Sequence, residues 1–174
     1  NVAAALGRLE LIRTLVDGGL DVNHKAIRRG DPDSDMWDYY EEGPTPLETA
    51  IDKRQLETVR LLIQLGAEVT DEHIIASIKI GFPDIIDLLM NQCSEINKYL
   101  HNQKTCLHCA SSDGHINVVK HLIKNGADVF SRSMESNEFP LDYAIENDRQ
   151  DIAEYLKYEM NRILDDKSND GSTQ

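Results

Sequence analysis

Two cysteines and a histidine lie close together in the segment Cys106-Leu107-His108-Cys109. Thiolate and imidazole groups at this spacing occur in zinc sites and in redox-active thiol pairs. A structural zinc site also needs a second pair of ligands, and the remaining cysteine, Cys93, has no such companion. No serine, cysteine or carboxylate can be placed beside His108 or His115 as an activated nucleophile, and no glycine-rich phosphate loop occurs. We therefore predict no catalytic residue, no metal and no cofactor.

An acidic segment offers a second kind of chemistry. Asp31, Asp33, Asp35 and Glu42 match positions one, three, five and twelve of a twelve-residue calcium loop. Met36 stands where such a loop needs glycine for its sharp turn, and no apolar helix flanks the segment. We interpret it as a solvated acidic finger, with a calcium-gated binder as the alternative.

The same segment carries Trp37, Tyr39 and Tyr40, which include the only tryptophan of the chain. Tryptophan and tyrosine are enriched in the binding hot spots of protein interfaces. One hypothesis is that these aromatic residues contact a partner. The other is that they fold back over the neighbouring part of the chain.

Composition narrows the class of partner. The 174 residues include 31 acidic and 18 basic side chains, which gives a formal net charge of −13. Nucleic-acid binders and proteins that bind anionic membranes carry clustered basic residues, so we expect neither partner. No apolar run approaches the roughly 20 residues that span a bilayer. Three cysteines suit a reducing compartment, so we expect a cytoplasmic protein, with the nucleus or a host cytoplasm as alternatives.

These residues need a scaffold to position them, and the sequence contains a repeated helical pattern that can provide it. In four places, a stretch with apolar residues at helical spacing is followed by the same kind of short segment. That segment has glycine or cysteine, then a small or apolar residue, then an acid and then a β-branched residue: Gly19–Val22, Gly66–Val69, Cys93–Ile96 and Gly126–Val129. A shorter helix precedes the stripe, as in Thr45–Ala50, Thr105–Ala110 and Phe139–Ala144. Neither helix can bury its apolar face alone, so such units must stack.

Local chemistry agrees with this scaffold. Thr45 and Thr105 can cap helix N-termini, and Pro46 suits a first helical turn, where its missing N–H costs nothing. Gly66 and Gly126 can adopt the left-handed conformation that ends a helix.

These segments resemble the ankyrin-repeat family, whose pattern is G-x-T-P-L-H-x-A-x-x-x-G-H-x-x-V-V-x-L-L-x-x-G-A-D-V-N. The best copy runs from Thr105 to Val129, and the resemblance extends from Ala3 to about Leu164. It implies an all-α solenoid of about five stacked helix-turn-helix units with short hairpin fingers. It also implies that Cys109 faces the core and that His108 bridges neighbouring units through hairpin backbone.

Spacing sets the expected boundaries. The interval from Ala3 to Ala50 exceeds the family period of about 33 residues by about 14, and that from Ala50 to Ser77 falls short by about six. We expect one domain over 1–164 and a polar, disordered tail over 165–174. Within the domain we expect units at about 1–23, 43–70, 71–98, 101–130 and 135–164, with an insertion at about 24–42. Apolar residues near Ala3 lead us to expect further chain before Asn1.

Ankyrin domains, as the resemblance implies, bind through hairpin tips and the concave face of the inner helices. With the aromatic residues of the insertion, the candidate partner-binding positions are Trp37, Tyr39, Tyr40, Glu41, Glu42, Asp52, Lys53, Lys79, Ile80, His101, Asn102, Lys104, Ser112, Asp113 and Glu146. We expect the insertion to project beside a gap left by the shortened finger of the next unit, floored by Lys79 and Ile80.

The predicted function is a protein-interaction module, monomeric, that binds a partner protein or peptide with a basic face. The alternative is a regulatory or substrate-recruiting domain of a larger enzyme or effector whose catalytic part lies outside this segment.

Overall fold

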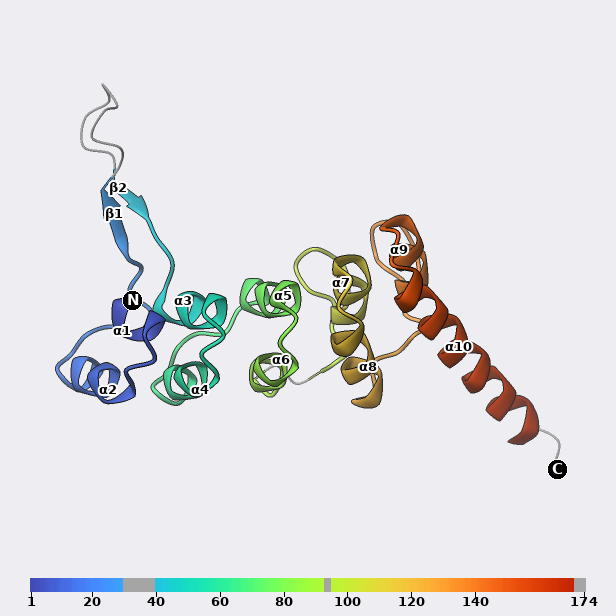
Figure 1. Ribbon diagram of the computed structural model, residues 1–174, viewed down its shortest axis with the longest axis horizontal. Helices are drawn as coiled ribbons and strands as arrows, with labels where there is room; N and C mark the ends of the chain where they lie inside the picture. Colours follow the sequence, from blue (N-terminus) through green and yellow to red (C-terminus); the bar gives the residue numbers. More distant parts are fainter. Residues whose placement is uncertain (30–39, 93–94, 171–174) are drawn as a thin grey trace, which may run out of the picture. The chain divides into compact units, whose positions relative to one another are not determined.

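A computed structural model describes residues 1–29, 40–92 and 95–170. These residues group into two compact units, Asn1–Ala76 (unit 1) and Ser77–Gln174 (unit 2). The boundary falls within one helix, α5 (Asp71–Ile80). Helices dominate both units, so the expected all-α repeat architecture is confirmed (Figure 1).

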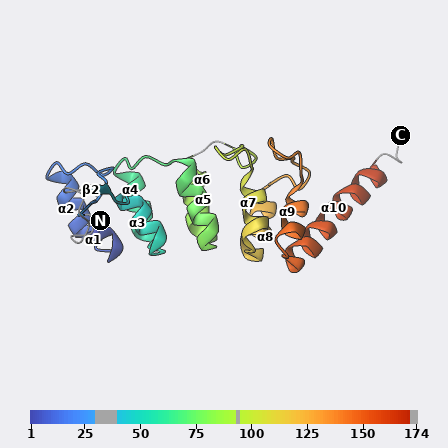
Figure 2. The same cartoon turned by 90° about the horizontal axis from the view of Figure 1, so that it is seen from above.

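The described residues of unit 1 form two helix pairs and a β-ribbon. Its elements are α1 (Val2–Ala5), α2 (Leu9–Asp17), β1 (Ile27–Arg29), β2 (Tyr40–Glu42), α3 (Pro46–Asp52), α4 (Leu56–Gln64) and the first turns of α5. The inner helices α1 and α3 pack together, as do the outer helices α2 and α4 (Figure 2). The strands pair antiparallel with Ile27 opposite Glu42. The expected insertion thus begins and ends as a ribbon.

The second helix pair of unit 1 follows from its sequence. The backbone N–H of Glu48 donates to the Thr45 hydroxyl (3.1 Å), and the Glu48 carboxylate accepts from the backbone N–H of Thr45 (2.6 Å). This capping box satisfies two N–H groups that would otherwise lack partners at the start of α3. Ala50 is fully buried, which lets α3 approach its neighbours closely. Gly66 has φ +93°, the left-handed conformation predicted for the residue that ends the outer helix.

Unit 2 continues the same plan. It contains the rest of α5, then α6 (Pro83–Met90), α7 (Cys106–Asp113), α8 (Ile116–Lys124), α9 (Pro140–Glu146) and α10 (Gln150–Asp170). Helix α7 packs on α9, and α8 contacts both α6 and α10. Leu107, Leu122, Ile152 and Leu156 are almost completely buried and form the centre of this core.

Two expectations about the helices have different outcomes. The third repeat, which departs most from the family pattern, does contain both expected helices, α5 and α6. The tail prediction was wrong for residues 165–170, because α10 continues to Asp170. Ion pairs from Arg162 to Glu159 and Asp166, three and four residues away, support the added turns. Residues 171–174 lie outside the described part of the chain.

Candidate partner-binding site

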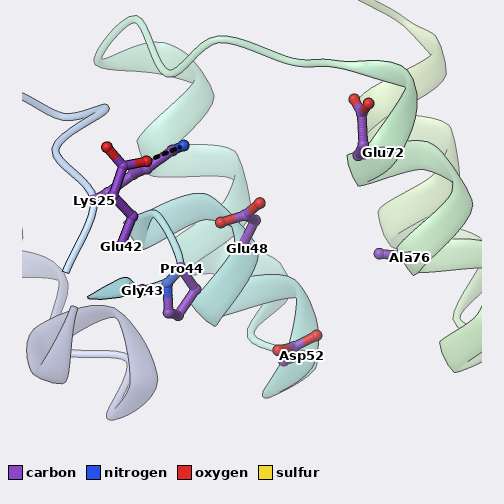
Figure 3. A pocket seen from close by; sticks show the side chains of 8 residues that line it. All are labelled: Lys25, Glu42, Gly43, Pro44, Glu48, Asp52, Glu72 and Ala76. Carbon is purple, nitrogen blue, oxygen red and sulfur yellow. Dashed lines mark hydrogen bonds and ion pairs between the residues drawn. The ribbon is translucent and has the colours of Figure 1, made fainter. Parts of the chain in front are cut away.

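An open hollow of about 450 Å³ lies in unit 1 beside the β-ribbon (Figure 3). Lys25 comes from the segment before β1, Glu42 from β2, and Gly43 and Pro44 from the segment after β2. Helix α3 contributes Glu48 and Asp52, and α5 contributes Glu72 and Ala76. Four of these eight residues are acidic and one is basic. The hollow therefore carries an excess of negative charge.

The single lysine of the hollow is already paired. Lys25 Nζ lies 2.8 Å from Glu42 Oε2, and both side chains are exposed. A hydrogen bond and the nearby Lys25 charge lower the pKa of the Glu42 carboxyl, so Glu42 is ionised at neutral pH. An exposed pair of this kind adds little stability, so an incoming cation can compete for Glu42 at small cost.

The remaining carboxylates differ in how they are engaged. Glu48 uses one oxygen in the capping box of α3. Asp52 is exposed in the last turn of α3, where the unsatisfied carbonyls of a helix C-terminus add partial negative charge. Glu72 is exposed in the first turn of α5. These groups and Glu42 present acceptor oxygens from three different elements to one open space.

The structure brings only some of the predicted binding residues to this hollow. Glu42 and Asp52 line it, and Lys53 is exposed at the C-terminal end of α3. Trp37 and Tyr39 lie outside the described residues, as do the side chains of Tyr40 and Glu41. The hypothesis of an aromatic loop beside a gap therefore stays a prediction, and so does the calcium alternative. Sequence reasoning missed Lys25, Glu48 and Glu72 as parts of one surface, since it could not anticipate where the ribbon lies.

The predicted positions in unit 2 are held by local contacts. Lys79, His101 and Glu146 are exposed, whereas Ile80, Asn102, Lys104, Ser112 and Asp113 are half-buried. Lys104 Nζ lies 4.4 Å from the centre of the Tyr143 ring, and the Ser112 carbonyl accepts from Arg149 Nε (3.1 Å). Burial raises the pKa of the Asp113 carboxyl. Nearby Glu138 raises the pKa of Glu146.

The cysteine and histidine motif of α7 is buried in the core of unit 2. Cys106 and Cys109 are buried and belong to no disulfide, and burial raises the pKa of Cys109, which disfavours the reactive thiolate. Nε2 of His108 lies 3.1 Å from the carbonyl oxygen of Glu138, which is the predicted bridge between neighbouring units. Within the described part of the chain, no group of three or more histidine, cysteine or acidic side chains is placed to hold a metal ion.

A second threonine–histidine contact was missed in the sequence. The backbone N–H of Thr70 donates to Nδ1 of His73 (3.1 Å), just as Thr105 donates to Nδ1 of His108 (3.2 Å). The shared signal is threonine followed three residues later by histidine. It was overlooked because Asp71 stands at the proline position of the family pattern and Ile75 at the alanine position.

With this geometry established, comparison with known proteins identifies the class. The family model described as ankyrin repeats (3 copies) matches residues 73–166. This chain belongs to the ankyrin-repeat family. Among the described helices, none is long and apolar enough to cross a membrane.

Curated relatives share parts of the chain. Alpha-latrocrustotoxin-Lt1a from Latrodectus tredecimguttatus is 30% identical over 148 residues, which is 82% of this chain and 10% of that protein. Alpha-latroinsectotoxin-Lt1a from the same species is 35% identical over 82 residues, or 47% of this chain and 6% of the toxin. NF-kappa-B inhibitor cactus from Drosophila melanogaster is 35% identical over 69 residues, or 40% of this chain and 13% of the inhibitor. The chain thus spans a small part of each relative it matches.

Proposed function

We propose that this chain is a protein-interaction module that binds a lysine- or arginine-rich segment of a partner protein in the hollow of unit 1. The observation that carries the proposal is the set of four carboxylates, Glu42, Glu48, Asp52 and Glu72, around one paired lysine in a single open space. Ankyrin arrays in general present extended surfaces to other proteins. The relative named an NF-kappa-B inhibitor acts on a protein, in keeping with this use of the fold.

Electrostatics favours a basic segment over other ligands. The hollow is open and its carboxylates come from three elements, so it offers several separate acceptors and suits a segment with several cations. Each exposed charge pair contributes only about 0.2–1 kcal/mol, so affinity must come from several pairs and from contacts around them. The net charge of −13 adds long-range attraction that accelerates encounter with a basic partner and weakens as salt rises.

A peptide-selection experiment tests this directly. A random twelve-residue phage library would be selected on the whole chain, and dissociation constants measured for the recovered peptides. We expect lysine and arginine to be enriched. The triple variant Glu42→Gln/Asp52→Asn/Glu72→Gln should weaken binding about tenfold or more, because three charge pairs together approach 1.4 kcal/mol or exceed it.

A matched control removes the same charge elsewhere. Glu10→Gln/Asp17→Asn/Glu57→Gln changes three exposed acids on the outer helices α2 and α4. Affinity should then stay within about twofold of the unmodified chain, a difference of about 0.4 kcal/mol. If both triple variants lost affinity equally, the effect would be due to the overall charge of the chain and not to the hollow. Selection of apolar peptides that bind both variants normally would contradict the proposed site.

The enzyme-associated role remains a second proposal. It is favoured by the small fraction of each relative that the chain covers, since the rest of such proteins can hold other domains. Here the hollow would recruit a basic substrate segment. Deleting the repeat segment from the full-length protein would then raise KM for that substrate and leave kcat unchanged.

A further inference from the structure

A second open hollow, with a volume of about 380 Å³, lies in unit 2 between the outer helices α6 and α8. Four of its described lining residues are apolar and form the floor: Ile86, Met90, Ile96 and Leu122. The other four are polar and form the rim: Asp87, Asn91, Glu95 and Asn125. We call this feature the outer hollow. It shares no residue with the binding positions predicted from the sequence.

Contacts from other parts of unit 2 hold the lining of the outer hollow in place. Cys106 Sγ lies 3.6 Å from Met90 Sδ, so α7 contacts the Met90 side chain. Asn97 donates from Nδ2 to the Gly126 carbonyl (3.2 Å) and accepts at Oδ1 from the Asp128 N–H (2.8 Å). These bonds tie the segment after α6 to the segment after α8. A surface that is fixed before binding loses less conformational entropy when a partner docks.

The rim carries two acidic side chains, one of which contacts a histidine. Nε2 of His121 lies 2.7 Å from Oδ1 of Asp87, and a carboxylate oxygen can only accept, so Nε2 carries the proton. A carboxylate has two oxygens, so Asp87 can accept from further donors. Glu95 is exposed. The eight described lining residues therefore offer two carboxylates and two side-chain amides, and they include no lysine or arginine.

The next interface of unit 2, between α8 and α10, shows which chemistry suits this place in the repeat. By register, Tyr155 of α10 corresponds to His121 and Glu159 corresponds to Asn125. Glu159 is only 7% exposed, and its Oε2 accepts from Nε (3.0 Å) and Nη2 (2.7 Å) of Arg162. A guanidinium group is thus paired with a carboxylate at this register. In the outer hollow the lining supplies the carboxylates, and a guanidinium has to come from another molecule.

We propose that the outer hollow is a second binding site of this chain, which receives an arginine side chain from a segment of a partner protein. The guanidinium lies at the rim between Asp87 and Glu95, and the aliphatic stem lies on Met90 and Ile96. Arginine suits the site better than lysine, because its five N–H donors serve two carboxylates and the amide oxygens together. Its head group is also more weakly hydrated, so less desolvation opposes its packing on apolar side chains.

The rim favours a peptide segment over a small guanidine compound. Asn91 and Asn125 are exposed beside the carboxylates. A side-chain amide both donates and accepts, which matches the N–H and C=O groups of a peptide backbone. The residues of the outer hollow all belong to unit 2, so this site is separate from the hollow of unit 1.

Peptide selection on a chain whose first hollow is neutralised tests the proposal. A random twelve-residue phage library would be selected on the variant Glu42→Gln/Asp52→Asn/Glu72→Gln. We expect arginine to be enriched among the recovered peptides. Adding Asp87→Asn/Glu95→Gln should weaken their binding about tenfold or more, because both charged acceptors of the guanidinium become neutral.

A matched control removes the same charge outside the outer hollow. Glu135→Gln/Glu154→Gln replaces two exposed acids of unit 2, and affinity should stay within about twofold. Asp87→Asn retains an oxygen that accepts from His121, so the fold should persist in the test variant. Replacing the arginine of a recovered peptide by lysine should weaken binding about fivefold or more, since bidentate bonding is lost.

Three results would overturn the proposal. The first is that no arginine-containing peptide is recovered whose affinity depends on Asp87 and Glu95. The second is equal affinity for the arginine and lysine forms of a recovered peptide. The third concerns n-butylguanidinium, titrated into the unmodified chain and followed by amide chemical shifts. If it bound as tightly as the peptides, the outer hollow would belong to small guanidine compounds.

Discussion

His108 illustrates how single residues hold neighbouring repeats together. Its Nε2 faces the Glu138 carbonyl, which can only accept, so Nε2 must carry the proton. In the neutral ring Nδ1 is then the acceptor for the Thr105 N–H, and the Thr105 hydroxyl lies 2.8 Å from the same nitrogen. Both ring nitrogens are used, and the buried ring is neutral because burial lowers the pKa of His108 below 6.5.

This arrangement predicts a dependence of stability on pH. The unfolded histidine titrates near 6.5, and the folded one titrates at lower pH, so between these values the unfolded state binds more protons. The contribution of His108 to the free energy of unfolding is therefore fully present above about pH 6.5, and it declines as the pH falls toward the pKa of the folded state. Urea unfolding at pH 7.5 and 5.5 should show a larger loss for the unmodified chain than for His108→Gln.

His24 provides the control because it is exposed. His24→Gln should retain the pH dependence of the unmodified chain. If His108→Gln retained it as well, the titration responsible would belong to other groups, among which His73 is also buried and has a lowered pKa.

Residue roles were predictable where the family pattern is intact. The Thr45 cap and the His108 bridge were expected from the segments Thr45–Ala50 and Thr105–Ala110, and the structure contains both. Thr70 and His73 were not recognised, although they make the same contact, because the neighbouring residues that usually mark the motif are replaced. The hydrogen bond between the threonine N–H and the histidine ring depends on these two residues alone, so it persists when the other residues of the motif are replaced.

At the scale of elements, the turns between helices differ in how much room they leave. Gly66 (φ +93°) would place a Cβ with nothing within 4 Å, whereas a Cβ at Gly81 (φ +71°) would lie 2.6 Å from Nδ1 of His115. That ring is held by a 2.7 Å contact from Nε2 to the Lys79 carbonyl. Both glycines need positive φ, but only Gly81 also needs the absence of a side chain.

Matched substitutions should separate these two requirements. Gly66→Ala should cost about 1–2 kcal/mol of unfolding free energy, the usual cost of placing alanine in the left-handed region. Gly81→Ala should cost more, by roughly 1 kcal/mol or above, since His115 must move and lose its hydrogen bond. Denaturant midpoints measured on both variants would show whether Gly81→Ala costs more than Gly66→Ala. Equal losses would show that His115 shifts without penalty.

Helix ends were harder to predict than helix faces. Apolar periodicity located the outer helices, but residues after Leu164 have no such periodicity, so the end of α10 was placed too early. The added turns are supported by contacts that periodicity does not register, among them the ion pairs of Arg162 and the position of Lys167 Nζ, 5.9 Å from the Phe130 ring. The hollow was missed for a related reason, since strand pairing between Ile27–Arg29 and Tyr40–Glu42 joins residues far apart in the sequence.

At the scale of the whole molecule, stability in a repeat protein is close to a sum of local terms. Each helix pair contacts its neighbours, so a defect weakens nearby pairs first. Leu47 lies in α3 of unit 1 and Leu107 in α7 of unit 2, and both are almost completely buried at equivalent positions of the inner helix. They form a matched pair of probes for how far a defect spreads.

Truncating each leucine should therefore produce a regional response. Leu47→Ala and Leu107→Ala should each cost about 2–5 kcal/mol, the range for removing a buried leucine side chain. Hydrogen exchange under native conditions should accelerate in α1–α4 for Leu47→Ala and in α7–α9 for Leu107→Ala, because local opening depends on the stability of the unit that opens. Ile145→Ala, at an exposed position of α9, should change stability by no more than about 0.5 kcal/mol. Uniform acceleration over both units in either leucine variant would instead mean that the chain unfolds as one cooperative body, and the division at Ala76 would then have no energetic counterpart.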